Sequence, residues 1–374
     1  MRIEPFLLER EQSIHENRVG VNLSESGVHP LTVHELVGSE DETRAVLDLP
    51  LSYIQTNGTP ELRQAVARLH PGTGEDEVEI TNGGSEANFV VCLHLLEPGD
   101  EVVVTIPNYL QAHGLARSMG AHVRPFRLRR DPRSGAYRAD LDELATLVTG
   151  NTKLLCLCNP NNPTGARLRP EELDDIARIA DKAGCWVLSD EVYRGAELDG
   201  NETATMHGRL ERVVVTGGLS KAYGLPGLRV GWVVGPRELV DGLWSVHDYT
   251  TIAPGALSDH LARIALRSGT RKRLLARTRS LLRENLALLL EWGQSFDEPL
   301  DITPPEAGAI AVVHCAPGTS SLEIARRARD DEDVLVVPGE HFDLPGTLRI
   351  GIGSEASILQ EGLARLGRVL SELS

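Results

Sequence analysis

The sequence predicts an α/β fold: a mostly parallel central sheet flanked by helices, followed by a smaller α+β domain. From about residue 60 to residue 240, short Val- and Leu-rich segments alternate with longer amphipathic patterns of helical period. Strands that are buried on both faces form continuous apolar runs, and their alternation with helices is typical of parallel sheets. After Pro254 the sequence changes to a long charged helical stretch, followed by short apolar strands and a final helix. This change predicts the second, smaller unit.

Each element of the central sheet is expected from its own pattern. Apolar runs of the length of ordinary buried strands lie at residues 78–81, 101–105, 122–126, 152–158, 186–190, 212–216 and 229–234. Apolar residues at helical spacing predict the covering helices, which lie at residues 60–69, 86–96, 110–119, 141–147 and 170–183.

The two ends of the chain are expected to be organised differently from the centre. The N-terminal part predicts a short helix at 5–17 and an irregular segment at 22–29 that can cross back to the active site or to the smaller domain. The C-terminal part predicts a helix at 257–292, strands near 310–314, 334–337 and 347–352, and a closing helix. We therefore expect an N-terminal segment that joins the small domain (1–40), a large domain (41–254) and a small C-terminal domain (255–374).

The charge of the chain argues against nucleic acid as a partner. Its 374 residues include 38 basic and 54 acidic side chains, for a formal net charge of −16. Such a surface repels a phosphate backbone. Basic residues gather at 124–133 and 271–273, but acidic residues surround both stretches, which predicts solvated faces rather than binding patches.

The sequence also lacks signals for a membrane, for secretion or for a metal. No apolar run reaches the roughly 20 residues that cross a bilayer, and the N-terminus lacks the apolar core of a signal peptide. Five cysteines without Cys-x-x-Cys spacing fit reduced, buried thiols better than disulfides or a zinc site. We expect a cytoplasmic protein with no membrane partner and no metal.

A glycine-rich stretch at 217–232 carries the strongest chemical signal. It sets Lys221 among small residues and places Arg229 eight positions later. An amine on a tight turn can form a Schiff base with an aldehyde, and a guanidinium can bind a phosphate through two parallel hydrogen bonds. The glycines let the backbone approach a ligand closely. A solvated loop is the alternative for this pattern taken alone.

Four other segments follow predicted strands and carry complementary groups. Asp190 ends the strand at 186–190, where its carboxylate can face a protonated pyridine nitrogen or simply cap the next helix. Asn162 lies in a Pro- and Gly-rich turn that can present its amide to a phenolic oxygen, and Tyr109 can stack on a flat ring. The fourth segment opens a helix whose free N–H groups can hold a phosphate; it contains Gly83, Gly84 and Ser85.

Five strand ends thus provide the groups that one phosphorylated pyridine requires. With this ordered set the sequence resembles the fold-type I enzymes that depend on pyridoxal 5′-phosphate (PLP), and among them the class I/II aminotransferase family, over nearly its whole length. The resemblance implies a PLP-dependent transferase that acts on an α-amino acid through an external aldimine and loss of the Cα proton. The motifs that carry it are Tyr53-x4-Gly58, Gly83-Gly84-Ser85, Tyr109, Asn162-Pro-x-Gly165, Asp190-x-x-Tyr193, Ser220-Lys221, Arg229 and Arg349.

The resemblance implies a role for each residue around the cofactor ring. Lys221 would form the Schiff base and later carry the Cα proton, Asp190 would pair with the pyridine nitrogen, and Tyr109 would stack on the ring. Asn162 and Tyr193 would hold the ring hydroxyl.

The resemblance also implies the residues of the phosphate and of the substrate. Tyr53 would reach the phosphate of the neighbouring subunit, which implies a homodimer with shared active sites. Arg349 would bind the substrate α-carboxylate, next to Asn162. The other phosphate ligands would be Gly83, Gly84, Ser85, Ser220 and Arg229.

Two features depart from the family pattern. Gly218 stands where many relatives have a phosphate-binding serine, so that one hydrogen bond is either missing or supplied by Thr216. Residues 24–29 replace a glycine-rich stretch and resemble the serine-rich segment of a PLP-dependent cyclase, which uses elimination and ring closure.

This serine-rich segment is expected to border the substrate. We take Ser26 and Gly27 as substrate-binding residues, and we expect Glu25, Ser26 or His29 to contact the substrate side chain and to influence the reaction after loss of the Cα proton. A capped loop without substrate contact is the alternative.

The sequence leaves the reaction type and the substrate side chain open. Transamination is the first interpretation; elimination, replacement, cyclisation or carbon–carbon bond formation in specialised metabolism is the second. A PLP-sensing DNA-binding regulator would carry a winged helix before this fold, but only about forty residues precede it. A nicotinamide dehydrogenase would need Gly-x-Gly-x-x-Gly after the first strand, and the sequence has none there.

Overall fold

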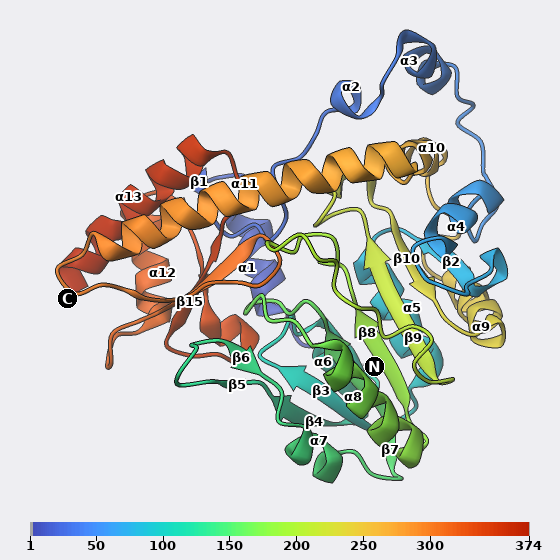
Figure 1. Ribbon diagram of the computed structural model, residues 1–374, viewed down its shortest axis with the longest axis horizontal. Coiled ribbons are helices and arrows are strands. Elements are labelled where there is room, and N and C mark those ends of the chain that lie inside the picture. Colours follow the sequence, from blue (N-terminus) through green and yellow to red (C-terminus); the bar gives the residue numbers. More distant parts are fainter. Residues whose placement is uncertain (1–2, 374) are drawn as a thin grey trace.

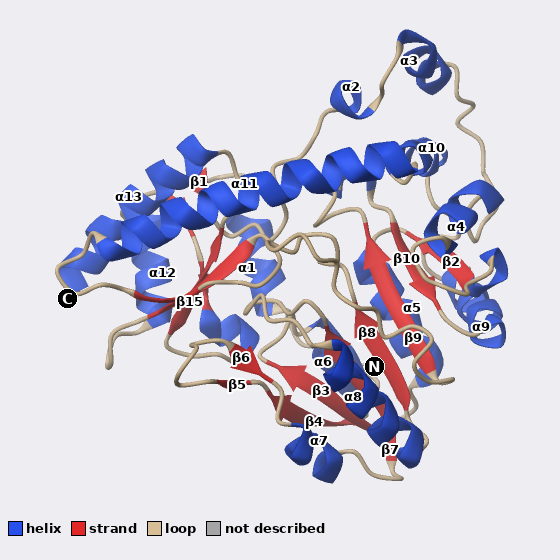
Figure 2. Ribbon diagram, viewed as in Figure 1, coloured by secondary structure: helices blue, strands red, loops and turns tan. Residues whose placement is uncertain are grey.

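The computed structural model of the chain describes residues 3–373 and contains the expected central sheet. Seven strands lie in the order β2-β10-β9-β8-β7-β3-β4 (Figures 1 and 2). All neighbours are parallel except β10, which is antiparallel to both of its partners. The strands are β2 (Val78–Thr81), β3 (Glu101–Ile106), β4 (His122–Arg127), β7 (Thr152–Cys158), β8 (Trp186–Asp190), β9 (Val213–Gly218) and β10 (Gly231–Val234).

Alternate residues of these strands pack on opposite faces of the sheet, which explains why their apolar runs are continuous. Val102 and Val104 face one layer of helices, and Val103 between them faces the other. The first layer consists of α5 (Gly84–Leu95), α6 (Gln111–Ser118) and α9 (Arg237–His247). The second includes α4 (Pro60–Ala67), α7 (Leu141–Leu147) and α8 (Pro170–Ala183).

A smaller antiparallel sheet follows the central one along the chain. Its order is β11-β12-β15-β14, and its strands are β11 (Asp301–Thr303), β12 (Ile310–His314), β14 (Val337–Pro338) and β15 (Thr347–Gly351). The long helix α11 runs past both sheets in Figure 1. The helices of this part are α10 (Ala256–Ala265), α11 (Ser268–Gln294), α12 (Ser321–Asp330) and α13 (Ala356–Leu373). A short hairpin is formed by β5 (Arg129–Arg130) and β6 (Tyr137–Arg138).

The N-terminal segment packs against the C-terminal part of the chain. Helix α1 (Leu7–His15) is followed by β1 (Val21–Asn22), which pairs in parallel with β13 (Val334–Leu335). Beyond it, α2 (Val33–Leu36) and α3 (Glu40–Leu47) lie on an arm that projects away from the rest of the chain (Figure 1). The remaining short helical turns are Glu75–Glu77, Pro226–Leu228 and Gly339–Phe342.

Three of the sequence predictions are wrong in detail. The helix expected at 257–292 is two helices, because Arg267 has an extended backbone (φ −59°, ψ 137°). Helix α10 packs against α4: Asp259 of α10 accepts a hydrogen bond from the N–H of Thr59, the N-cap residue of α4, at 3.1 Å. The strand expected at 334–337 is divided between β13 and β14, which pair with different strands.

The third correction concerns the start of β10. Arg229 was expected in this strand, but it lies outside it in the left-handed region (φ 51°), and β10 begins at Gly231. Its side chain is thereby turned toward Ser220 instead of alternating across the sheet. In the described part of the chain, no helix combines the length and the apolar character needed to cross a bilayer.

Candidate active site

A cavity of about 300 Å³ lies at the carboxyl ends of the parallel strands. Side chains of the central sheet, of the smaller sheet and of the N-terminal segment all border it. The predicted site residues that line it are Gly84, Ser85, Tyr109, Asn162, Asp190, Tyr193, Ser220, Lys221, Arg229, Arg349 and Ser26. The carboxyl ends of parallel strands are usual places for a ligand in open α/β sheets.

Lys221 lies just beyond the end of β9 and points into this cavity. Burial lowers the pKa of its amine, and the nearby Arg349 and Arg229 act in the same direction, against Glu25 and Glu9. A lowered pKa increases the fraction of neutral amine, which is the nucleophilic form. This amine is therefore suited to join an aldehyde.

Asp190 is held in one orientation by two hydrogen bonds. The Asn88 amide donates to one carboxylate oxygen at 2.9 Å, and the Val192 N–H donates to the other at 3.1 Å. The Thr216 hydroxyl donates in turn to the Asn88 carbonyl oxygen at 2.8 Å. Burial raises the pKa of Asp190, against these hydrogen bonds and Lys221. A buried carboxylate in this setting is completed by a cationic partner such as a protonated pyridine.

The sequence reasoning missed Asn88, although its spacing carried a signal. Asn88 follows Ser85 by three positions on α5, so the two side chains share one face of the helix. That face is directed at the cavity, since both residues line it. The contact also answers the question of the missing serine: Thr216 is fully buried and bonded to Asn88, and it does not line the cavity.

The start of α5 forms a cradle of free N–H groups, with hydroxyls and a guanidinium beside it. Gly83, with φ 92°, precedes the first turn, which has no side-chain cap. A Cβ atom added at Gly231 would lie 2.3 Å from the carbonyl carbon of Gly83, so only glycine allows this approach. The Arg229 guanidinium donates to the Ser220 hydroxyl at 3.3 Å. Free N–H groups, hydroxyls and a guanidinium at one helix N-terminus fit a phosphate group.

Arg349, on β15, also lines the cavity. It is 1% exposed, it donates to Asn162 at 3.1 Å and to the Ser24 carbonyl oxygen, and it lies over the Phe342 ring at 4.9 Å. Its Nε has no hydrogen-bond partner among residues 3–373. A buried guanidinium with an unused donor can receive a carboxylate.

Tyr193 and the serine-rich segment meet beside Lys221. Burial raises the pKa of Tyr193, opposed by Arg349 and by a hydrogen bond with Ser26. Gly27 packs against Lys221: a Cβ atom added at this glycine would lie 3.7 Å from the lysine Cδ. His29 is turned elsewhere, with its Nε2 at 3.4 Å from Glu355, and it does not line the cavity.

Helix α1 forms a wall of the cavity that the sequence did not predict. Leu8, Glu9, Gln12 and Glu16 all line the cavity, and Glu25 joins them. The Tyr109 hydroxyl donates to Glu9 at 2.8 Å. Burial raises the pKa of Glu16, and the charges of Glu25 and Glu9 raise it further. The amphipathic pattern at 5–17 predicts a helix, but it contains no information about which strand ends this helix contacts.

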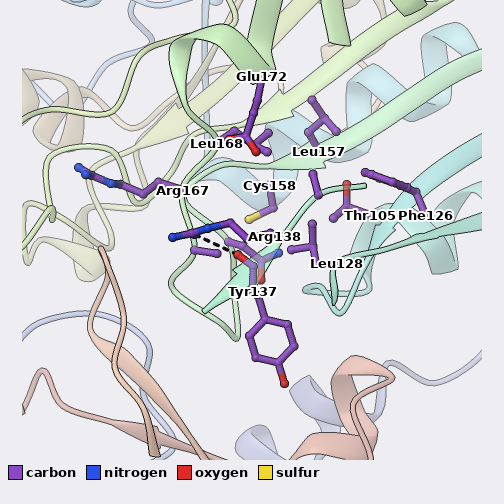
Figure 3. Close-up of a pocket in the computed structure, with 13 residues that line it drawn as sticks. Thr105, Phe126, Leu128, Tyr137, Arg138, Leu157, Cys158, Arg167, Leu168 and Glu172 are labelled. Carbon is purple, nitrogen blue, oxygen red and sulfur yellow. Dashed lines mark hydrogen bonds between the residues drawn. The ribbon is translucent and has the colours of Figure 1, made fainter. Parts of the chain in front are cut away.

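One predicted site residue, Tyr53, and a second, smaller cavity lie outside this cavity. Tyr53 is 83% exposed on the arm and does not line it. A second cavity, of about 20 Å³, lies on the other side of Cys158 and is bordered by Phe126, Leu157 and Arg138 among others (Figure 3). This volume is close to that of a single water molecule, far too small for a cofactor.

Comparisons with known proteins agree with this geometry. The sequence model of the family described as aminotransferase class I and II matches residues 28–366. The chain belongs to this family. It is 34% identical to a capreomycidine synthase of Streptomyces vinaceus over 93% of this chain and 89% of that protein.

Solved structures show the same fold. A PLP-dependent aminotransferase from Streptococcus suis superposes with a TM-score of 0.92 at 30% identity, over 100% of this chain and 99% of that one. A PLP-dependent cyclase, OrfR, superposes with a TM-score of 0.89 at 28% identity over the same shares. The protein is therefore an aminotransferase-like PLP enzyme of fold type I, which acts on amino acids.

Proposed function

We propose that this enzyme transfers the amino group of an α-amino acid whose side chain is cationic. When bound, PLP supplies an aldehyde that joins an amino group and a ring that withdraws electrons. The proposal assigns the Schiff base and the proton at Cα to Lys221, because its amine has a lowered pKa and faces the cavity. Asp190 faces the ring nitrogen in this assignment, and Tyr109 the ring face.

The remaining cofactor contacts follow from the two ends of the cavity. We assign Asn162 and Tyr193 to the ring hydroxyl, Arg349 to the substrate carboxylate, and Ser26 and Gly27 to substrate contact; the contacts of Arg349 with Asn162 and of Ser26 with Tyr193 support this assignment. The phosphate is assigned to the cradle at the start of α5, formed by Gly83, Gly84, Ser85, Ser220 and Arg229.

The observation that carries the substrate class is the acidic wall opposite Lys221. Glu9, Glu16 and Glu25 line one cavity of about 300 Å³. The cations of this cavity are Arg229 and Arg349, assigned to the two anionic groups of cofactor and substrate, and Lys221. Three neighbouring carboxylates repel one another: burial raises the pKa of Glu16 first, and the charges of Glu25 and Glu9 add to the rise. A guanidinium or ammonium group on the substrate side chain relieves this repulsion.

A substrate panel tests the proposal. Arginine and lysine are expected to be turned over with kcat/KM values at least tenfold above those of alanine and glutamate, about the effect of one charge-assisted contact. Glu16→Gln should reduce this preference, mainly through KM. The matched control is Glu11→Gln on the same helix, because Glu11 pairs with Arg329 and does not line the cavity. Equal rates for alanine and arginine in the wild type would refute the cationic substrate.

The serine-rich segment supports a second candidate, a cyclisation or elimination on the same substrate class. Ser26 bonds to Tyr193 beside Lys221, and the similar proteins include a capreomycidine synthase and a PLP-dependent cyclase. Products distinguish the two candidates. Transamination yields a keto acid and one equivalent of pyridoxamine phosphate when no acceptor is added, whereas cyclisation or elimination leaves the aldehyde form of the cofactor unchanged.

We further propose a cytoplasmic homodimer in which the arm completes the partner's site. Large apolar side chains are exposed along the arm and the nearby loop: Leu47, Leu51, Tyr53, Tyr249 and Ile252. Such a patch on a family member of this fold favours a second copy as its occupant. We propose that the chain is divided into an N-terminal segment (1–40), a large domain (41–254) and a small domain (255–374). Helix α10 of the small domain contacts α4 of the large domain. Sedimentation at micromolar concentration tests the dimer; a monomer would contradict it.

A further inference from the structure

A buried ionic cluster lies directly behind the start of α5. His247, the last residue of α9, sits between Glu79 of β2 and Glu86 of α5. Its Nδ1 lies 2.9 Å from Glu79 and its Nε2 lies 3.2 Å from Glu86. The side chains of His247 and Glu79 are 0% exposed, and that of Glu86 is 10% exposed. Three titratable groups are thus enclosed next to the phosphate cradle, and none of them lines the cavity.

Glu86 connects the turn before the cradle to the loop after α9. It accepts the N–H of Asn82 at 2.6 Å and the hydroxyls of Thr250 and Thr251 at 2.6 and 2.8 Å. The Asn82 amide in turn donates to the Ala253 carbonyl oxygen at 3.3 Å. These bonds fix the backbone that leads into Gly83 and hence the direction of the first free N–H groups of the helix.

The same carboxylate creates an electrostatic difficulty. Glu86 directly follows Ser85 in the first turn of α5, at the end of the helix that favours anions. It therefore competes with a phosphate dianion for the positive end of the helix and repels that dianion. A cation next to Glu86 removes the repulsion without breaking its hydrogen bonds, and His247 is placed to be that cation.

We propose that His247 is a positioning residue for the cofactor phosphate: it neutralises Glu86, which holds the phosphate-binding turn in place. This inference rests on the proposed function, since it takes the cradle at Gly84 and Ser85 as the phosphate site. His247 does not touch the cofactor; it acts through Glu86.

The ionisation of the cluster agrees with this role. Burial would lower the pKa of His247, but Glu79 and Glu86 together raise it to about 9. Burial would raise the pKa of Glu86, but His247, Thr250, Asn82 and Thr251 together lower it to about 2. At neutral pH both are charged. Burial raises the pKa of Glu79, His247 opposes this, and the charges of Glu86 and of Asp248, which follows α9, add to the rise.

The test measures cofactor binding to the apoprotein and not turnover. In His247→Gln the dissociation constant for PLP should rise about tenfold, the size of a charge effect at a partly buried helix end. Pyridoxal, which lacks the phosphate, should bind both proteins equally. The matched control is His94→Gln in the last turn of α5, the helix whose first turn carries Glu86; this change should leave the constant unchanged.

A charge-removing variant separates electrostatics from packing. Glu86→Gln in the His247→Gln background should restore PLP affinity to within about twofold of the wild type, since the carboxylate next to the phosphate is then absent. Glu86→Gln alone, which keeps His247, should bind PLP at least as tightly as the wild type. Wild-type affinity of His247→Gln, or a double variant as weak as the single one, would overturn the inference. A wild type that binds no PLP would contradict the proposed function instead.

Discussion

The two ends of the active-site cavity are built in opposite ways. The cofactor end, as we assign it, is made of glycines, a helix start and hydroxyls that all follow strands of one sheet. The substrate end, as we assign it, is made of Arg349 from the smaller sheet and of carboxylates from α1, which reaches the cavity from another part of the chain. The first end arises from local connections, and the second from long-range packing.

This difference indicates which contacts are fixed by the sheet and which can change with the packing of α1. The position of a residue at the end of a parallel strand is set by the sheet, so each cofactor ligand tolerates little movement. Helix α1 is held mainly by side chains: Tyr109 binds Glu9, and the Phe6 ring lies 4.8 Å from the Tyr109 ring. A few substitutions on that helix can therefore change the substrate without disturbing the cofactor.

The largest expected effect tests the cofactor end. Lys221→Ala should lose about a thousandfold or more in kcat, because no other lysine among residues 3–373 lines the cavity to form the Schiff base and carry the proton. Absorbance spectra should show bound PLP without the band of the lysine-linked aldehyde. Lys182→Ala, an exposed lysine on α8, is the control. Persistence of that band in Lys221→Ala would contradict the assignment.

The next effect tests the substrate end. Arg349→Lys keeps the charge but loses the planar fork, so kcat/KM should fall about 30- to 100-fold while PLP affinity stays within about twofold. Steady-state kinetics and a PLP titration measure the two quantities on the same preparation. If PLP affinity fell as strongly as kcat/KM, the two ends would not be separable in the way that we describe.

A smaller effect concerns the arm. Tyr53→Phe removes one hydroxyl that we assign to the partner's phosphate, and it should raise the dissociation constant for PLP by about tenfold, as expected for one hydrogen bond to a charged group. Analytical ultracentrifugation should show the same oligomeric state as in the wild type. An unchanged constant in a dimeric protein would remove Tyr53 from the cofactor end.

The smallest effect is a pH dependence of stability. The pKa of His247 is raised from 6.5 to about 9, so its contribution is complete below about pH 6.5 and is lost as the pH rises through 9. The pKa of Glu86 is lowered from 4.5 to about 2, so its contribution is complete above about pH 4.5 and is lost as the pH falls from there through 2. Between pH 8 and 10, the Tm of the wild-type apoprotein should fall by about 2 °C more than the Tm of His247→Gln.

Much of the cofactor end could be predicted from the sequence, for a physical reason. Lys221, Asp190, Asn162 and Tyr109 each follow a strand, and parallel strands bring their carboxyl ends to one edge of the sheet. Asn88 was missed because its role depends on a helix face and not on a strand end.

The substrate end could not be predicted to the same extent. Glu9 and Glu16 lie more than 90 positions before Tyr109, and only the pairing of β1 with β13 and the packing of α1 bring them to the cavity. The extended backbone at Arg267, which ends one helix and begins another, follows likewise from the attachment of α10 to α4. Local periodicity carries no information about such contacts.

The attachment of α1 has a practical consequence for anyone who expresses this gene. A start site chosen downstream of residue 20 would delete Glu9 and Glu16 yet leave the whole central sheet intact. We expect such a product to bind PLP and to show its absorbance, so that a spectrum alone would not reveal the truncation. Only a test with the substrate would reveal the loss of two of the three carboxylates that we assign to its recognition.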